Sequence, residues 1–254
     1  MSYLIDSHTH LHDREFFTEV QAAEMLKNAE ALGVQQMICI GTTSADSLVA
    51  RDFAATHKNV FWTYGVHPEY SKNYTINCKK SAKLVAIGEI GLDYHYDNYD
   101  KQAQWKLLEK MLSLALELDL PCSFHVRDAL PDFFSIVANF SKLKTSVLHS
   151  FSDTPENLET ALTKGFYIGI NGLATFANLA CYKNIGPELL DRALLETDAP
   201  FLTPVPKRGK INEPGYVKYV AEFLANKFGV SLDFVAETTT QNAQRIFHLP
   251  NPEQ

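Results

Sequence analysis

Short apolar runs alternate with helical patterns along the whole 254-residue chain, and this alternation restricts the folds that it can adopt. Eight of the runs are apolar on both sides, as expected for strands buried on both faces of a parallel sheet. They span residues 3–6, 36–40, 60–65, 85–89, 121–125, 145–149, 166–170 and 193–197. Between many of them, apolar residues recur at helical spacing, over residues 15–32, 44–57, 100–118, 129–140 and 155–164.

This order of elements predicts an α/β protein, a single (β/α)8 TIM barrel with extra C-terminal helices over residues 215–228 and 231–247. The two extra helices would pack on the outside of the barrel or close its bottom. A doubly wound open sheet is the alternative, but no Gly-x-Gly-x-x-Gly turn is present to hold a dinucleotide. No repeat or linker divides the chain, so we expect one domain over residues 1–254.

Composition excludes several classes of protein. The cysteines Cys39, Cys78, Cys122 and Cys181 form no Cys-x-x-Cys pair, and most lie in or beside apolar runs, which is typical of reduced cytoplasmic thiols. No signal peptide is recognisable, and no apolar run approaches the roughly 18 residues of a membrane span. A net charge of −7 argues against coating nucleic acid through bulk charge, although it is compatible with a local basic patch.

Two histidines separated by one residue follow the first apolar run. In a strand, residues i and i+2 point to the same face, so His8 and His10 can direct both imidazoles at one point. This spacing suits two ligands of one divalent metal ion. A single pair of this kind can also arise by chance, so the interpretation depends on the other metal-binding residue types.

Further histidines and carboxylates stand at the carboxyl ends of the predicted strands, where TIM barrels carry their working residues. Taken singly, His125 or His149 would be a hydrogen-bonded core histidine, and Asp198 the N-cap of a helix. Glu89 lies in an apolar strand, where a lone carboxylate is costly without a cation. A metal centre explains the whole set, which comprises His8, His10, Glu89, His125, His149 and Asp198.

The same stretches resemble the TatD family of metal-dependent hydrolases, within the amidohydrolase-like barrels, over essentially the whole chain. The shared motifs are Asp6–Leu11, Gly65–Pro68, Ile87–Asp93, His125–Ala129, His149–Phe151, Glu196–Pro200 and the stretch 202–214. The resemblance implies a (β/α)8 nuclease, because several members remove nucleotides from the 3′ end of DNA with magnesium. Hydrolysis of D-aminoacyl-tRNA is attached to other members.

The chain departs from the family pattern at three positions. His12 stands where the family often has Asp, Glu69 where relatives commonly have a second histidine, and Lys207 where His often precedes the arginine. None of these positions belongs to the predicted metal ligands. They concern the surroundings of the site and its substrate preference.

The resemblance also implies a division of the ligands between two divalent metal ions. His8, His10 and Asp198 would hold one ion, His125 and His149 the other, and Glu89 would bridge them. Asp198 would orient the attacking water and accept its proton, so Glu89 and Asp198 are the predicted catalytic residues. Mg²⁺ follows from the family, whereas the histidine-rich ligation suits Zn²⁺ or Mn²⁺ equally well.

Basic residues in the loop after the eighth strand are candidates for binding phosphate. Lys207, Arg208 and Lys210 lie close together there, in a barrel region that frequently holds phosphate groups. Arg127, two residues beyond a predicted ligand, and His67 at the rim are further candidates. The predicted substrate-binding residues are therefore His67, Arg127, Lys207 and Arg208.

Aromatic residues just past the ligand-bearing strands could stack a terminal base. These are Tyr94, Tyr96 and Phe151. Aromatic side chains at the rim of a barrel are also often only packing, so this hypothesis stands apart from the metal site.

Three functions remain for comparison with the structure. The favoured one is a divalent-metal-dependent deoxyribonuclease or phosphodiesterase that removes nucleotides from the 3′ end of nucleic acid, DNA above all, by a metal-activated water. The alternative is a D-aminoacyl-tRNA deacylase or another amidohydrolase-type C–N or C–O hydrolase, which would need less cationic charge than the basic turn supplies. A barrel that binds without turnover is disfavoured because Asp198 is intact. We expect a cytoplasmic monomer without membrane contact.

Overall fold

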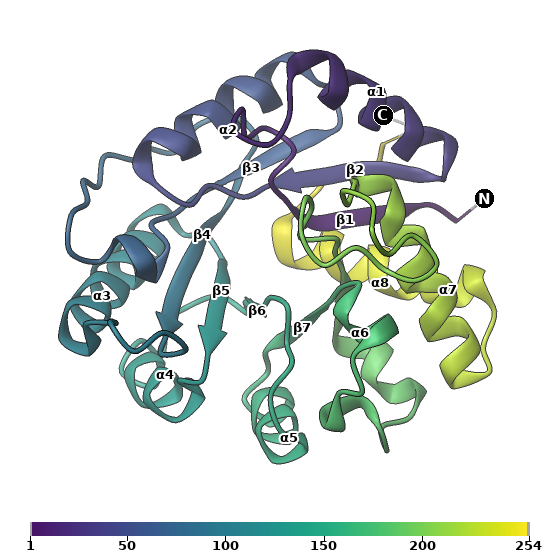
Figure 1. Cartoon of the computed structure of the whole chain (residues 1–254). Helices are drawn as coiled ribbons and strands as arrows, with labels where there is room; N and C mark the ends of the chain where they lie inside the picture. Colours follow the sequence, from purple (N-terminus) through teal and green to yellow (C-terminus); the bar gives the residue numbers. More distant parts are fainter. Residues whose placement is uncertain (1, 253–254) are drawn as a thin grey trace.

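The computed structural model describes residues 2–252, and its strands form one parallel sheet in the order β1 to β8. The sheet is wound into a nearly closed barrel with helices around it, which confirms the predicted (β/α)8 architecture (Figure 1). The strands are β1 Leu4–Thr9, β2 Val34–Cys39, β3 Val60–Tyr64, β4 Leu84–Asp93, β5 Cys122–Arg127, β6 Val147–Leu148, β7 Tyr167–Ile170 and β8 Ala193–Leu195.

Helices connect most of the strands, close to where the apolar spacing predicts them. They are α1 Glu19–Ala31, α2 Ser44–Thr56, α3 Lys101–Leu118, α4 Leu130–Val137, α5 Pro155–Thr163, α6 Leu173–Phe176, α7 Val217–Phe228 and α8 Leu232–Phe247. Short 3-10 helices, which the sequence pattern did not predict, are η1 Pro68–Tyr70, η2 Ala180–Tyr182, η3 Pro187–Arg192 and η4 Pro214–Tyr216. The short α6 was also not predicted.

Helix α1 begins later than the predicted residue 15, and local hydrogen bonds explain the difference. Thr18 is the N-cap, because its hydroxyl accepts a hydrogen bond from the backbone N–H of Gln21. The Gln21 side chain in turn accepts from the backbone N–H of Thr18, which completes a capping box. The residues before Thr18 therefore belong to the loop that follows β1, at the carboxyl end of the barrel.

Three strands extend beyond their predicted ends at 6, 89 and 125. Strand β1 continues through His8 to Thr9, β4 continues through Glu89 to Asp93, and β5 continues to Arg127. Polar residues marked the ends of these strands in the sequence. In the barrel these polar residues remain part of the strands, because neighbouring strands and histidines provide partners for their polar groups.

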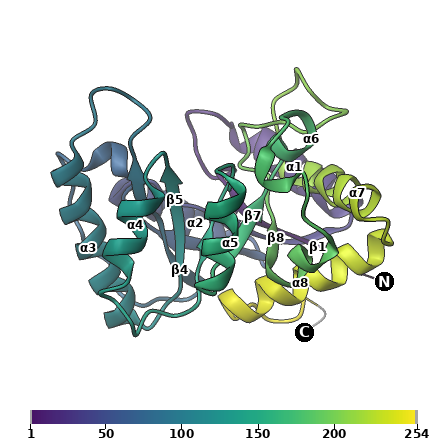
Figure 2. The same ribbon diagram turned by 90° about the horizontal axis from the view of Figure 1, so that it is seen from below.

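The apolar residues separate into a layer under the outer helices and a second cluster inside the barrel. The inner cluster contains Ile5, Phe61 and Leu194 from the starts of strands, packed against Ile246 and Phe247 of α8. Helix α8 therefore closes the bottom of the barrel, and in Figure 2 the arrowhead of β5 points away from it. Helix α7 packs outside, since its buried residues belong to the outer layer.

The barrel closes where the first and last strands meet. Thr9 forms an isolated parallel bridge with Ala199, and the backbone N–H of Asp198 donates to the carbonyl of His8 at 2.9 Å. The buried carboxylate of Asp6 accepts hydrogen bonds from the N–H and the hydroxyl of Thr197, at 2.9 and 2.6 Å. This seam brings residues from opposite ends of the chain side by side.

Other predictions from composition can be compared with the described residues. The four cysteines are free thiols, and three of them are buried. Between residues 2 and 252, no helix combines the length and the apolar character needed to cross a bilayer. The single domain over 1–254 stays a prediction, because its end residues lie outside the described range.

Gly91 provides a test of how tightly β4 and β5 approach. Its φ is +152°, and a Cβ at this position would lie 1.7 Å from the carbonyl oxygen of His125. We expect Gly91→Ala to lower the free energy of unfolding by about 3 kcal/mol or more, because backbone strain and a backbone clash add together. The measurement is chemical denaturation followed by circular dichroism.

The matched control is Gly33→Ala, at a glycine with φ +85° and no atom within 4 Å of a built Cβ. That variant meets only backbone strain, so its loss of unfolding free energy should stay at roughly 1–2 kcal/mol. Equal losses in the two variants would contradict the close approach of the strands at Gly91.

Candidate metal centre

A cavity of about 590 Å³ opens at the carboxyl ends of the strands. Five of the six predicted metal ligands line it, and they are His10, Glu89, His125, His149 and Asp198. The sixth, His8, lies next to them and is 1% exposed. The structure therefore brings together all the residues that the sequence proposed as ligands.

Glu89 stands at the middle of this group. Its Oε1 lies 3.0 Å from Nδ1 of His125 and 2.9 Å from Nε2 of His149. Its Oε2 lies 3.5 Å from Nε2 of His8. The two oxygens of one carboxylate thus face two different sets of histidines.

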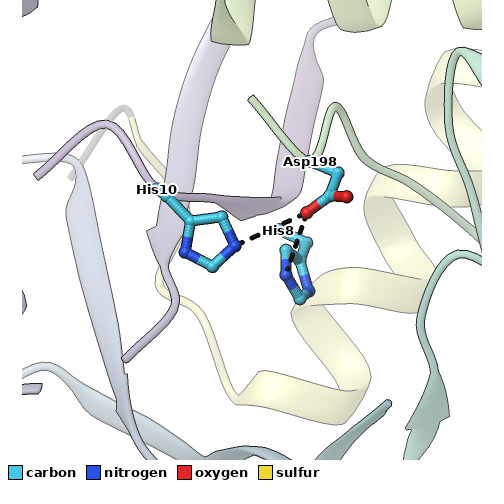
Figure 3. Close-up of side chains that lie close together, drawn as sticks. All are labelled: His8, His10 and Asp198. Atoms are coloured by element: carbon cyan, nitrogen blue, oxygen red, sulfur yellow. Dashed lines mark ion pairs between the residues drawn. The ribbon is translucent and has the colours of Figure 1, made fainter. Parts of the chain in front are cut away.

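Asp198, which follows β8, lies beside His8 and His10, the histidines near Oε2 of Glu89 (Figure 3). His8 and His10 each place Nε2 at 3.5 Å from Oδ1 of Asp198. These three residues come together because the seam holds the end of β1 against the segment after β8. Their ligand atoms all lie within 4.8 Å of one another, as do those of His8, Glu89 and His149.

The spacing of these atoms fits divalent cations. Metal–ligand bonds of about 2.1 Å place neighbouring ligand atoms about 3.0 Å apart in an octahedron and about 3.4 Å apart in a tetrahedron. The distances of 2.9, 3.0 and 3.5 Å around Glu89 and Asp198 match this range. Both ring nitrogens of His8 are buried and have no hydrogen-bond partner within the described part of the chain, so Nε2, which faces Glu89 and Asp198, is free to bind a metal.

Neighbouring groups orient the ligand histidines. Nδ1 of His10 lies 3.1 Å from the carbonyl oxygen of Ile40, and Nε2 of His125 lies 2.8 Å from Oδ2 of Asp93. Such contacts select the ring nitrogen that remains available to a metal. Sequence reasoning left Asp93 out of the site. Its place four residues after Glu89, at the end of the same strand, was the signal that could have identified it.

Glu196 is a second residue that the sequence-based prediction missed. Its Oε1 lies 3.6 Å from Nδ1 of His149 and accepts a hydrogen bond of 2.6 Å from the backbone N–H of Ser150. Gly169 leaves room for it, because a Cβ there would lie 2.3 Å from Oε2 of Glu196. The sequence shows a carboxylate two residues before Asp198, but only the structure shows that it lies beside His149.

The charges in the cluster stabilise one another. Burial alone would raise the pKa of Glu89, but the charge of His149 and hydrogen bonds from the surrounding histidines hold it well below its usual range. For His149, burial lowers the pKa, but Glu89 and Glu196 raise it well above its ordinary value. Burial also opposes the charge on His10, and Asp198 nevertheless raises its pKa to about 9. Divalent cations would replace the protons on these histidines.

His67 differs from the other histidines of the site. Its Nε2 lies 3.9 Å from Oε1 of Glu89, and with Glu89 and His125 it forms another group within 4.8 Å. Its Nδ1 accepts a hydrogen bond from the backbone N–H of Glu69 at 3.3 Å. Burial and the charge of His125 lower the pKa of His67 to about 3, so the ring is neutral. A neutral ring with an accepting Nδ1 carries its proton on Nε2, which then presents an N–H to the cavity.

The four predicted substrate-binding residues lie in two different places. His67 and Arg127 line the cavity, and Arg127 is the only lysine or arginine among the described residues that do so. Lys207 lies outside the lining, with Nζ 5.6 and 5.3 Å from the ring centroids of Tyr216 and Tyr219.

Arg208 also lies outside the lining. Its Cζ is 3.8 Å from the ring centroid of Phe176, and its guanidinium donates to the carbonyl of Thr203 at 3.0 Å. The side chains of Lys207 and Arg208 therefore contact neighbouring aromatic rings and a backbone carbonyl outside the cavity.

The predicted stacking residues do not line the cavity within the described chain. Phe151 is buried, and the hydroxyl of Tyr94 is hydrogen-bonded to Trp105 and Asp132. Tyr96 is exposed and lies under the guanidinium of Arg127, at 5.7 Å. The aromatic residues that do line the cavity are Phe16, Tyr70 and Phe201. Sequence reasoning missed them, because it assigned Phe16 to a helix and could not place the long loops.

Comparisons with known proteins agree with this geometry. The family model described as TatD related DNase matches residues 5–248. The "uncharacterized metal-dependent hydrolase YabD" of Bacillus subtilis is 33% identical over 255 residues, covering 97% of this chain and 99% of that protein. The "3′-5′ ssDNA/RNA exonuclease TatD" of Erwinia tasmaniensis is 34% identical over 247 residues, covering 89% and 93%.

A solved structure shares the fold over nearly its whole length. YjjV, a TatD homologue from Escherichia coli K12, superimposes with a TM-score of 0.85 at 26% identity, covering 97% of this chain and 98% of that one. Family model, relatives and structure all span the barrel together with its cluster of histidines and carboxylates. The chain therefore belongs to the TatD-related DNase family and is a metal-dependent hydrolase.

Proposed function

We propose that the protein is a phosphodiesterase that removes nucleotides from the 3′ end of single-stranded nucleic acid, with DNA as its main substrate. The observation that carries this proposal is the position of Glu89, whose two oxygens face separate sets of histidines. One carboxylate between two ligand sets can hold two metal ions close together, as in enzymes that hydrolyse phosphodiesters with two metals. The name of the Erwinia relative supports the choice of substrate and of the end that is attacked.

The proposed ligand sets follow the distances in the cavity. His8, His10 and Asp198 would hold one ion, and His125 and His149 would hold the other. Glu89, which lies between the two sets, would contribute to both. When bound, divalent ions lower the pKa of water and offset the negative charge that builds on a phosphoryl group. The family favours Mg²⁺, and the histidine-rich donor set suits Zn²⁺ or Mn²⁺ as well.

Asp198 acts as the general base. Its side chain lines the cavity and is 15% exposed, so a water molecule can reach it. Burial raises the pKa of Asp198, but His10 and His8 lower it by more, so the net shift is downward. The carboxylate is therefore ionised and able to accept a proton. The water proton passes to Asp198 as the water oxygen attacks phosphorus. The bond between phosphorus and the 3′ oxygen of the preceding nucleotide breaks, and that oxygen leaves with the shortened strand and takes up a proton from solvent.

Donors on the other side of the cavity hold the phosphoryl group. Nε2–H of His67 points into the cavity and can donate to a phosphoryl oxygen. Arg127 supplies a guanidinium for the same or the neighbouring phosphate. Lys207 and Arg208 lie outside the lining, so we propose them as contacts to phosphates farther along a bound strand.

A second candidate, hydrolysis of a D-aminoacyl-tRNA or another C–N or C–O bond, also has an observation in its favour. The cavity contains one arginine but also the carboxylates Asp13, Glu15 and Glu69, which suits a substrate with little negative charge near them. Metal-reconstituted protein incubated with 5′-labelled single-stranded DNA, RNA and a D-aminoacyl-tRNA distinguishes the candidates. We expect the labelled strands to shorten stepwise. Deacylation without shortening would select the second candidate.

The bridging role of Glu89 leads to a prediction about metal content. Glu89→Ala removes both oxygens, so we expect bound metal to fall by at least one ion per chain and hydrolysis to cease. Elemental analysis of the purified variant measures the metal, and Glu117→Ala, at an exposed position on α3, is the control. Unchanged metal content in Glu89→Ala would contradict the bridge.

A second prediction separates binding from chemistry. Asp198→Asn keeps the shape of the side chain but removes the proton acceptor, so kcat should fall at least about 100-fold. Binding of a labelled oligonucleotide should persist, because the donors at His67 and Arg127 remain. Steady-state kinetics and fluorescence anisotropy measure the two properties, and turnover within a few-fold of wild type would exclude Asp198 as the base.

A third prediction concerns His67, which distance alone also allows as a metal ligand. If Nε2 donates to substrate, His67→Ala should retain its metal and lower kcat/KM by about 1.5–3 kcal/mol, the range of a hydrogen bond to a charged group. His67→Gln, which restores an N–H donor, should recover part of this loss. Loss of metal from both variants would instead make His67 a ligand.

A further inference from the structure

Two phenylalanines at the mouth of the cavity form an exposed aromatic wall. Phe16 and Phe201 are 44% and 47% exposed, and their ring centroids lie 5.3 Å apart at an interplanar angle of 81°. The ring of Phe201 also lies 6.4 Å from that of His10, one of the proposed metal ligands. Single exposed phenylalanines are common on protein surfaces. Two in contact, both lining a catalytic cavity beside a metal ligand, provide a flat apolar surface next to the reacting group.

This aromatic wall, Phe16 and Phe201, stands across the barrel from Arg127. Phe16 follows β1 and Phe201 follows β8, and these strands are neighbours at the seam. Arg127 ends β5, which is the strand opposite β1 in an eight-stranded barrel with the order β1 to β8 (Figure 1). The proposed metal ligands therefore separate an aromatic side of the cavity from a cationic side.

The aromatic side is also the acidic side. Asp13 and Glu15 lie in the same loop as Phe16, and Glu69, which follows β3, lines the cavity between this side and the side of Arg127. They act on a common region, because burial and then the charges of Glu69, Asp46, Glu15 and Asp13 raise the pKa of the neighbouring Tyr70. Carboxylates in this position repel phosphate groups but not an uncharged base.

We propose that the aromatic wall binds the base of the single terminal nucleotide that is released, while the rest of the strand leaves the cavity over Arg127. This inference rests on the proposed phosphodiesterase function. Bases stack on aromatic side chains without regard to sequence, because every base has a π-face. The carboxylates beside the wall exclude a further phosphate, so one nucleotide at most fits beyond the scissile bond. The cavity thereby restricts cleavage to a chain end.

Base removal tests the wall directly. The double variant Phe16→Leu/Phe201→Leu keeps apolar bulk at two exposed positions and removes both rings. Its substrates are two 5′-labelled single strands that differ only in the last nucleotide, which carries a base in one and a tetrahydrofuran abasic residue in the other. The control is Phe234→Leu on α8, an exposed phenylalanine (46%) outside the cavity lining.

We expect the double variant to lose about tenfold in kcat/KM for releasing the base-bearing nucleotide, the effect of one stacked base. Release of the abasic residue should stay within about twofold, because it makes no stacking contact. An equal loss on both substrates would overturn the wall as a base site and leave the exonuclease in place. If wild-type protein shortens neither strand, the proposed function and this inference both fail.

The limit of one nucleotide has its own test. A strand with a 3′-terminal phosphate places a charge beside the carboxylates, so wild-type protein should release its last nucleotide at least about tenfold more slowly than from a 3′-hydroxyl end. Glu15→Gln/Glu69→Gln should reduce that difference, whereas Glu117→Gln should not. Equal rates on the two ends in wild-type protein would overturn the limit.

Discussion

The structure depends on a buried negative charge that no single strand can stabilise. Glu89 is 4% exposed within β4, and Ile87 and Ile90 beside it are fully buried. A carboxylate at such a position requires cations or hydrogen-bond donors around it. Strands β1, β5 and β6 provide them at their carboxyl ends as His8, His125 and His149, which is possible only when these ends meet in one barrel mouth. The same arrangement that compensates Glu89 provides donor atoms for divalent ions.

A second constraint is the seam that joins the two ends of the chain. The carboxylate of Asp6 is buried, which raises its pKa well above the usual value, and it accepts two hydrogen bonds from Thr197. Few regular strand hydrogen bonds join β1 to β8, so this side chain takes over part of their role. Asp198 follows Thr197 directly, and the seam therefore sets its distance to His8. The contacts that close the barrel therefore also position Asp198 in the candidate site.

The cavity is chemically two-sided, and this asymmetry relates the fold to its function. Exposed aromatic rings and carboxylates follow β1, β3 and β8, whereas Arg127 follows β5. In the middle, neighbouring groups contact one ring nitrogen each of His10, His125 and His149, whereas His67, through its accepting Nδ1, turns an N–H into the cavity. A phosphodiester in this cavity would meet donors on one side, and aromatic rings with carboxylates beside them on the other. This is a reason to expect recognition of a chain end rather than of a long duplex.

The sequence by itself determined the barrel and its candidate metal ligands. Buried parallel strands are short and apolar on both sides, and catalytic residues of barrels stand at strand ends, so His8, Glu89 and His125 could be identified without coordinates. The tertiary structure alone decided which groups meet across strands, such as Glu196 with His149. It also decided that Phe16 and Phe201 face the cavity while Lys207 and Arg208 lie outside its lining. The physical reason is that periodicity records the faces of regular elements, whereas the direction of a loop side chain depends on capping, ring contacts and neighbours far away in the chain.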